Sequence, residues 1–168
     1  MHTKQSLCQD LQKAKIYPND TVIMHFSMKA IGSVEGGAEG VLDALMTYFQ
    51  PGLLVLPALT WANVHAEQPI FDPLQTPCCV GLLPEMFRKR MGVVRSWHPT
   101  HSVAAYGADA AAFCAGNERC DTPCARTSPW GKLLDRGAKI ALVGCTLTSC
   151  TFLHGVEEWA DVPGRLEE

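Results

Sequence analysis

The chain has 168 residues, of which 47% are hydrophobic and 18% are charged, so it is long enough to bury one core and too apolar to be mainly disordered. Its 14 Lys and Arg against 17 Asp and Glu give a net charge of −3, which argues against binding nucleic acid or a membrane through bulk charge. No apolar run is long enough to span a membrane, and the first residues lack the apolar core of a signal peptide. We therefore expect a cytoplasmic protein that forms one domain over residues 1–168.

Eight cysteines are spread along the chain, and no two of them form a C-x-x-C pair. A zinc knuckle needs such pairs, and disulfides need an oxidising compartment for which the sequence has no export signal. We expect reduced and mostly buried thiols, with a metal or redox role as the lesser alternative.

The first half of the chain alternates between helical and extended patterns. Apolar residues at helical spacing predict helices over residues 3–15 and 38–49. Nearly continuous apolar runs predict strands buried on both faces over 21–25 and 53–57. Residues 58–80 hold several prolines and little periodicity, which predicts a long loop, and long loops in compact domains are often functional.

Shorter elements are predicted in the second half. In order, we expect a helix over 82–90, strand pieces at 93–94 and 102–106, a helix over 108–115, an irregular stretch over 117–129, a strand over 139–144 and a helix that starts at 152. Strands that alternate with helices indicate an α/β sandwich.

A glycine-containing turn follows the first predicted strand. It runs through Ser27, Lys29 and Ile31-Gly32 to Gly36-Gly37, and a helix comes next. Glycines let backbone N–H groups approach a ligand closely, and a helix N-terminus favours an anion. The segment could therefore hold a phosphate with help from Lys29, although an ordinary strand-to-helix turn has the same pattern.

Two histidines stand close together in the segment His98-Pro-Thr-His101. A metal would need a further ligand, for which His154 and Asp72 are candidates, and this arrangement would suit a metal-dependent hydrolase. The simpler interpretation is a turn in which one histidine is structural.

His154 and Glu157 are three residues apart at the start of the last predicted helix. That spacing places both on one helix face, where a carboxylate raises the pKa of an imidazole and fixes its tautomer. Such a histidine can act as a general base, although a surface His–Glu pair is the commoner outcome.

The predicted loop over 58–80 carries Trp61, His65, Glu67 and Asp72. Acidic groups beside an aromatic ring suit a cationic ligand. The Asp72-Pro73 pair could equally begin a plain turn.

Taken together, these segments resemble the aminoglycoside 3-N-acetyltransferase family. The matching stretches occur in family order: Asp20–Gly32, Gly36–Ala38, Phe71–Pro73 with Thr76-Pro77, Gly81–Arg88, Arg95-Ser96, His98–Ala105, Ser128-Pro129 with Lys132-Leu133, and Thr148–His154 with Glu157. They cover nearly the whole chain.

The resemblance implies a layered α/β sandwich with a central mixed sheet flanked by helices, and acetyl transfer from acetyl-CoA to the 3-amino group of an aminoglycoside or to another amine, without a metal. It implies His154 as the catalytic base with Glu157 beside it. The implied contacts to CoA are Ser27, Lys29, Ile31, Gly32, Gly36, Gly37, Ser102 and Val103. On the side of the antibiotic, the resemblance implies Asp72, to which the loop composition adds Trp61.

The sequence also departs from the family pattern. Family members usually run further beyond the residue that corresponds to His154, so the chain looks truncated at its C-terminus. Lys29 stands where arginine is usual and lacks its bidentate fork, and Cys78-Cys79 stands where a small hydroxylic residue is usual. The alternative to an active enzyme is therefore a weakly active or inactive CoA-binding relative. A metal-dependent hydrolase using His98, His101 and His154 is the third hypothesis.

Overall fold

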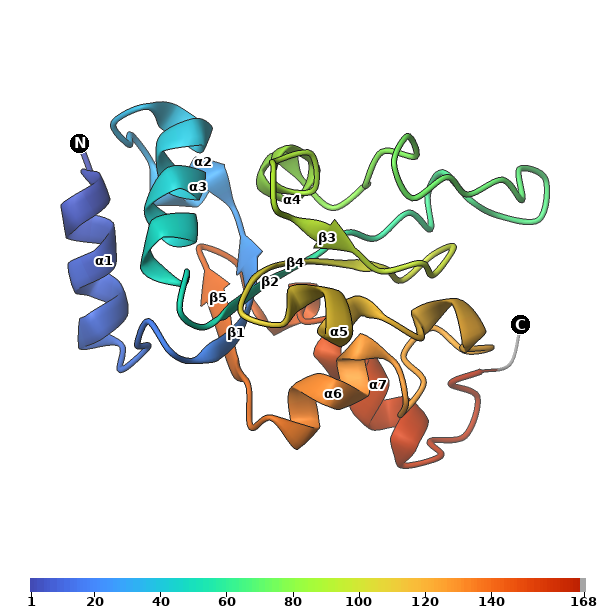
Figure 1. Cartoon of the computed structure of the whole chain (residues 1–168). Helices are drawn as coiled ribbons and strands as arrows, with labels where there is room; N and C mark the ends of the chain where they lie inside the picture. The colour runs from blue at the N-terminus through green and yellow to red at the C-terminus, as the bar shows by residue number, and fades with distance from the viewer. Residues whose placement is uncertain (167–168) are drawn as a thin grey trace.

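A computed structural model of the chain describes residues 1–166. At its centre is a five-stranded sheet with the order β3-β4-β2-β1-β5 (Figure 1). The strands are β1 (Thr21–Phe26), β2 (Leu53–Pro57), β3 (Val94–Arg95), β4 (Val103–Gly107) and β5 (Lys139–Val143). The helices are α1 (Lys4–Lys13), α2 (Met28–Ile31), α3 (Gly37–Tyr48), α4 (Leu82–Phe87), α5 (Ala110–Cys114), α6 (Pro129–Asp135) and α7 (Phe152–Trp159), with short 3₁₀ turns η1 (Asn117–Arg119) and η2 (Leu147–Ser149).

The sheet is mixed, and its parallel part decides where a ligand can bind. Strand β1 pairs in parallel with β2 on one side and with β5 on the other. Strand β4 runs antiparallel to both β2 and β3. The carboxyl ends of β1, β2 and β5 therefore meet at one edge, where β4 begins, and ligands of open α/β sheets bind at that edge.

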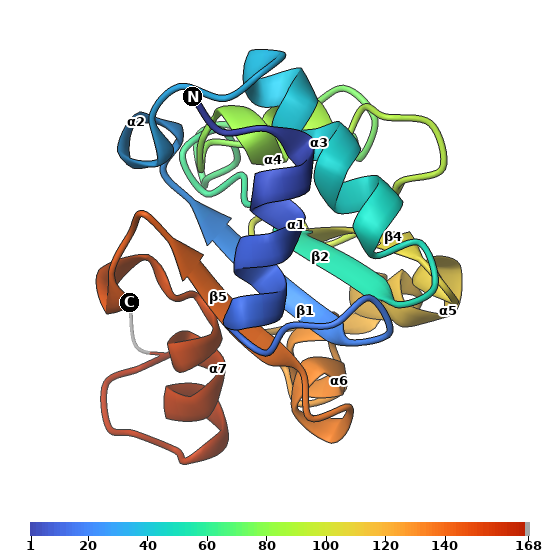
Figure 2. The same ribbon diagram turned by 90° about the vertical axis from the view of Figure 1, so that its left-hand side faces the viewer.

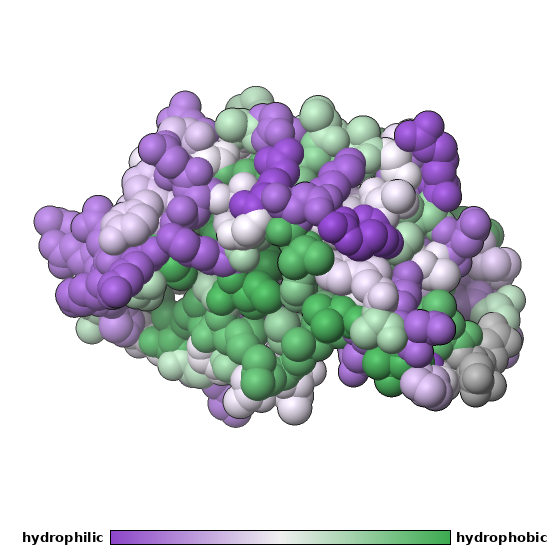
Figure 3. All heavy atoms as spheres, turned by 90° about the horizontal axis from the view of Figure 1, so that it is seen from below, coloured by the Kyte–Doolittle hydropathy of each residue, from purple (hydrophilic) through white to green (hydrophobic). Residues whose placement is uncertain are grey.

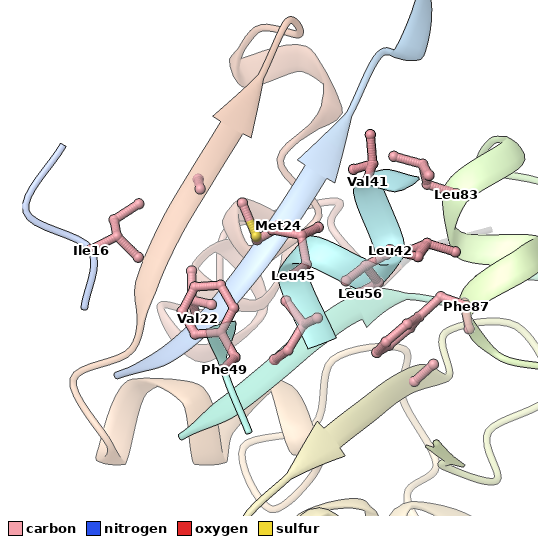
Figure 4. Packing of buried hydrophobic residues seen from close by; sticks show 14 of the residues in the cluster. Ile16, Val22, Met24, Val41, Leu42, Leu45, Phe49, Leu56, Leu83 and Phe87 are labelled. Carbon is pink, nitrogen blue, oxygen red and sulfur yellow. The ribbon is translucent and has the colours of Figure 1, made fainter. Parts of the chain in front are cut away.

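Helices cover both faces of the sheet, as the sequence predicts for an α/β sandwich (Figure 1). On one face α1, α3 and α4 pack over a core whose side chains interlock between helix and strand (Figure 4). Met24 and Leu56 from the strands meet Leu45 and Phe49 of α3 there, and all four are almost fully buried. Burial of this kind contributes about 1.5–3 kcal/mol for each large apolar side chain.

The second core lies on the opposite face, beneath α5, α6 and α7. Trp130 at the start of α6 is its largest fully buried side chain and packs with Ile23 and Phe113. The indole Nε1 of Trp130 donates a hydrogen bond of 3.0 Å to the carbonyl oxygen of His101. The core of this face is thereby tied to the turn that precedes β4.

Two helices, α2 and α6, were not predicted from the sequence. The irregular stretch expected over 117–129 holds only the η1 turn, and α6 begins at its end. The start of α6 has a recognisable signal: Ser128 accepts a hydrogen bond from the N–H of Trp130, and Pro129 occupies the first turn. The other predicted helices and strands are confirmed, with boundaries that move by a few residues.

Strand β5 is one edge of the sheet, and α1 lies in front of it and β1 (Figure 2). A hollow of about 670 Å³ beside β5 is lined mainly by apolar side chains of α1, β1 and β5, among them Leu11 and Phe26. Apolar side chains also gather on the face seen from below (Figure 3). None of the helices within residues 1–166 has the length and apolar character needed to cross a membrane.

Candidate active site

A cavity of about 380 Å³ lies where the parallel strands end. His25 and Phe26 come from the end of β1, Pro57 from the end of β2, and Thr148 and Ser149 from the turn after β5. The other lining residues are Leu59, Trp61, Val80, Pro84, His101, Thr151 and His154. The volume falls in the range of small-molecule sites, and three histidines converge on it.

His154 in the first turns of α7 has the carboxylate partner that the sequence predicts. Its Nδ1 lies 3.1 Å from Oε2 of Glu157, three residues further along the same helix. The same oxygen lies 3.2 Å from Nε of Arg165, in an ion pair whose angle falls short of a hydrogen bond. Because an ionised carboxylate only accepts hydrogen bonds, it holds the proton of His154 on Nδ1 and leaves the lone pair on Nε2.

His25 is a second imidazole of the cavity, and it is only 5% exposed. Burial lowers its pKa from 6.5 to about 4, so the ring is neutral at pH 7. Its Nε2 is sealed from solvent and has no hydrogen-bond partner within the described part of the chain. Such an unsatisfied buried nitrogen is costly and uncommon in folded proteins.

The segment His98-Pro-Thr-His101 forms a tight turn just before β4. Nδ1 of His98 accepts hydrogen bonds from the backbone N–H groups of Thr100, at 3.2 Å, and of His101, at 2.9 Å. Burial lowers the pKa of His98, against a smaller opposite effect of a hydrogen bond with the backbone of Thr122. His98 therefore stabilises the turn, and the side chain of His101 lines the cavity.

The glycine-containing segment after β1 lies next to the cavity rather than inside its lining. Gly36 and Gly37 start α3 with positive φ angles of 75° and 59°. A Cβ on Gly36 would lie 3.2 Å from Cα of Gly40, so the backbone here is too close for a side chain. Lys29 on α2 is exposed. Ser27, Ile31 and Gly32 belong to the same exposed or half-exposed segment.

A buried arginine fixes the long loop over residues 58–80. Arg95 donates hydrogen bonds to the carbonyl oxygens of Ala58 at 2.8 Å and Thr76 at 2.7 Å, and through Nε to Oγ of Ser102 at 3.0 Å. Its guanidinium also lies over the ring of Phe71, 5.2 Å from the centroid. Burial lowers the pKa of Arg95 to about 10, which still leaves it charged at neutral pH.

Two residues expected to contact CoA lie in the interior instead. Ser102 and Val103 are fully buried, and Oγ of Ser102 donates to the carbonyl oxygen of Ala58 at 2.7 Å besides accepting from Arg95. The N–H of Val103 donates to Oγ of Ser96. These polar groups form hydrogen bonds within the protein, and contact of Ser102 and Val103 with CoA stays a prediction.

Of the two residues expected on the antibiotic side, only one lines the cavity. Trp61 lies at the wall and is 53% exposed. Asp72 is exposed elsewhere on the loop, and its Oδ1 accepts from the N–H groups of Leu74 and Gln75. Asp72 therefore starts a turn, which is the alternative that the Asp-Pro pair left open.

The positions of the side chains bear on two expectations, that of reduced, buried thiols and that of a metal site. All eight cysteines are unpaired, and four of them are buried. Burial raises the pKa of Cys78 to about 11 and those of Cys114 and Cys124 to about 12, so these thiols are not nucleophiles at neutral pH. In the part of the chain that the structure describes, no three histidine, cysteine or carboxylate side chains are grouped to hold a metal ion.

His25 was not predicted as a site residue, because it falls within the buried strand predicted over residues 21–25. The signal was its position: a polar residue at the carboxyl end of a parallel strand lies at the ligand-binding edge of the sheet. Thr148, Ser149 and Thr151 also line the cavity, and they were noted only as part of the family resemblance.

Comparison with known proteins identifies the family of this chain. The family model described as aminoglycoside 3-N-acetyltransferase matches residues 23–168. Aminoglycoside N(3)-acetyltransferase VII of Streptomyces paromomycinus is 35% identical over 97% of this chain, and enzyme VIII of Streptomyces fradiae is 34% identical over 97%. The chain spans 62% and 63% of the lengths of these two relatives.

Solved structures of the family share the fold. AAC(3)-IVa superposes with a TM-score of 0.87 at 25% identity, covering 96% of this chain and 62% of that one. A binary complex of AAC-IIIb with CoASH gives a TM-score of 0.84 at 27% identity, covering 96% of this chain and 66% of that one. AAC-VIa bound to sisomicin gives 0.84 at 28% identity, covering 92% and 64%. The chain therefore belongs to the aminoglycoside 3-N-acetyltransferase family.

Proposed function

We propose that this chain transfers an acetyl group from acetyl-CoA to the 3-amino group of an aminoglycoside, with His154 as the general base. The observation that carries the proposal is the His154–Glu157 pair, 3.1 Å apart, on the wall of a cavity at the carboxyl ends of three parallel strands. Family membership supplies the reaction class, since the relatives are aminoglycoside N(3)-acetyltransferases.

The chemistry requires one proton transfer before the new bond is complete. The acceptor amine attacks the carbonyl carbon of the thioester, and the electron pair of the C=O π bond moves to oxygen. Nε2 of His154 takes a proton from the attacking nitrogen, while Glu157 supports the positive charge that forms on the ring. Collapse of the tetrahedral intermediate forms the amide and breaks the C–S bond. The imidazolium then returns its proton to the departing thiolate, which gives CoASH and restores His154.

Direct attack of this kind needs no nucleophile from the protein. The raised pKa values of the buried thiols agree with that, because a protonated thiol attacks a thioester poorly.

We place the phosphates of CoA along the segment from Ser27 to Gly37. The N-terminus of α3 favours an anion, and Gly37 leaves open space where a side chain would otherwise stand, so a phosphate can approach the backbone there. Lys29 adds an exposed positive charge. The acidic side chain of Glu39 in that turn is neutralised by an ion pair with Arg90. The complex of AAC-IIIb with CoASH supports CoA as the ligand class.

Trp61 is the side chain that we assign to the acceptor. An indole face beside the general base attracts an ammonium group through a cation–π interaction, worth about 0.5–1 kcal/mol at an exposed site. Asp72 lies outside the cavity lining and uses its Oδ1 in its own turn, so we assign it only a long-range attraction for the cationic acceptor.

A thiol-release assay with acetyl-CoA and a panel of aminoglycosides, including sisomicin and apramycin, tests the proposal. We expect aminoglycoside-dependent release of CoASH, and a loss of about 10²–10⁴-fold in kcat for His154→Ala. Calorimetry should show that CoA binding survives in that variant. His65→Ala is the matched control, because His65 is an exposed imidazole paired with Glu67 away from the cavity.

The alternative outcomes are distinct. Binding of CoA without release for any acceptor would overturn the enzyme and favour a CoA-binding relative. Release that persists in His154→Ala would overturn the general base.

A further inference from the structure

His101 lines the same cavity as His154, and from the sequence it was predicted only as part of a turn or as a metal ligand. Its backbone is held on both sides: the N–H donates to Nδ1 of His98 at 2.9 Å, and the carbonyl oxygen accepts from Nε1 of Trp130 at 3.0 Å. A residue fixed in this way presents its ring in one orientation without further ordering.

The hydrogen bonds around Thr100 decide where the proton of His101 sits. Nδ1 of His98 already accepts two backbone N–H groups, which saturates its single lone pair. The hydroxyl of Thr100 lies 3.4 Å from that nitrogen but 2.9 Å from Nδ1 of His101. When the hydroxyl of Thr100 donates to Nδ1 of His101, the proton of the His101 ring lies on Nε2, and the role inferred for His101 requires this tautomer.

That Nε2 is free to meet a ligand. It makes no hydrogen bond within residues 1–166, and, unlike Nε2 of His25, it is not sealed from solvent. The ring is also neutral, because burial lowers the pKa of His101 to about 4, with smaller electrostatic contributions from His98, His154 and Arg165 in the same direction. A neutral ring with its proton on Nε2 offers a donor there and does not compete with His154 for the proton of the substrate.

We infer that His101 is a second catalytic residue, which donates a hydrogen bond from Nε2–H to the thioester oxygen as that oxygen becomes negative. The cavity then holds two imidazoles of opposite character, a lone pair on His154 and a donor on His101. Attack on a thioester requires both at once: a base for the amine and a donor for the oxyanion. The inference rests on the proposed acetyl transfer.

Kinetics of two substitutions at one position test this role. His101→Leu removes the donor at similar bulk, and His101→Gln returns an N–H near the position of Nε2. We expect kcat to fall by about 10²–10³-fold in His101→Leu with the KM for acetyl-CoA nearly unchanged, and to recover at least tenfold of that loss in His101→Gln. The pH dependence of the residual activity should keep the shape of the wild type, since His154 remains. His65→Leu is the control for loss of an imidazole outside the cavity.

A measurement without turnover tests the tautomer. Long-range ¹H–¹⁵N spectra of the histidine rings, assigned with His101→Gln, should show the His101 proton on Nε2 and a neutral ring at pH 6. A proton on Nδ1, or a charged ring at pH 6, would overturn the inference.

The failures of the two proposals can be told apart. If the wild type transfers no acetyl group, the proposed function falls and the catalytic role of His101 falls with it. If the wild type is active and His101→Leu keeps its kcat, or His101→Gln recovers none of the loss while folding normally by circular dichroism, only the role of His101 is overturned.

Discussion

Acidification should destabilise this protein well before its carboxylates are protonated, because His25 and His101 are neutral inside the fold. The pKa of each ring falls from 6.5 to about 4, in both cases chiefly through burial. In the unfolded chain the rings recover their ordinary pKa and bind protons that the folded state excludes. Stability is therefore complete above about pH 6.5 and decreases as the pH falls from there towards 4.

The size of the effect follows from the same values. One pKa unit corresponds to about 1.4 kcal/mol, so the fall from 6.5 to about 4 is worth ~3 kcal/mol per ring when protonation is complete. Between pH 7.5 and pH 5 the linkage relation gives about 2 kcal/mol per ring, or about 4 kcal/mol for both. That is a large share of the 5–15 kcal/mol that stabilises an ordinary domain.

Urea unfolding followed by tryptophan fluorescence at pH 7.5 and pH 5.0 measures this difference. His25→Gln and His101→Gln should each remove about 2 kcal/mol of the pH dependence, whatever they do to the stability at pH 7.5. His65→Gln, which removes an exposed imidazole outside the cavity, is the control substitution. An equal loss of stability on acidification in the wild type and in His25→Gln would show that His25 is not buried as a neutral ring.

Three further predictions concern the loop, the start of α3 and the catalytic pair. Arg95→Met should lower the free energy of unfolding by about 3–5 kcal/mol and expose residues 58–80 to protease, because it leaves buried carbonyl oxygens without donors; an unchanged urea midpoint would refute this. Gly40→Ala places a Cβ 1.9 Å from a backbone oxygen, so we expect a loss of more than about 2 kcal/mol in the same assay, and a loss below about 0.5 kcal/mol would contradict it. Glu157→Gln should lower kcat about 10²-fold at constant KM for acetyl-CoA, since the uncharged amide no longer supports protonated His154; wild-type kcat would count against the pair.

Local sequence patterns were sufficient to predict most of the helices and strands. The two apolar runs of β1 and β2 are buried strands, and the helix after the glycine pair spans Gly37–Tyr48. The spacing of His154 and Glu157 was also sufficient to predict that the two side chains meet, because residues three apart on a helix share a face whatever surrounds them. Helix α6 was missed although Ser128 and Pro129 mark its start, because the irregular stretch was extended to residue 129 and no element was assigned after it.

Which residues meet at the cavity could not be read from local patterns. His25 and His101 are 76 positions apart in the sequence, and they line one cavity because β1 ends at the edge where β4 begins. Ser102 follows His101 directly yet turns inward to Arg95 and Ala58, because successive residues entering a strand point to opposite sides.

The sequence by itself therefore determined the elements, the family and the His154–Glu157 pair, all of which depend on contacts within a few residues or on ordered motifs. Only the tertiary structure decided that Asp72 starts a turn, that Ser102 and Val103 are interior, and that His101 joins His154 at the cavity. The physical reason is that burial and strand order are properties of the whole sheet. They decide which polar groups are used up by the protein and which remain available to a ligand.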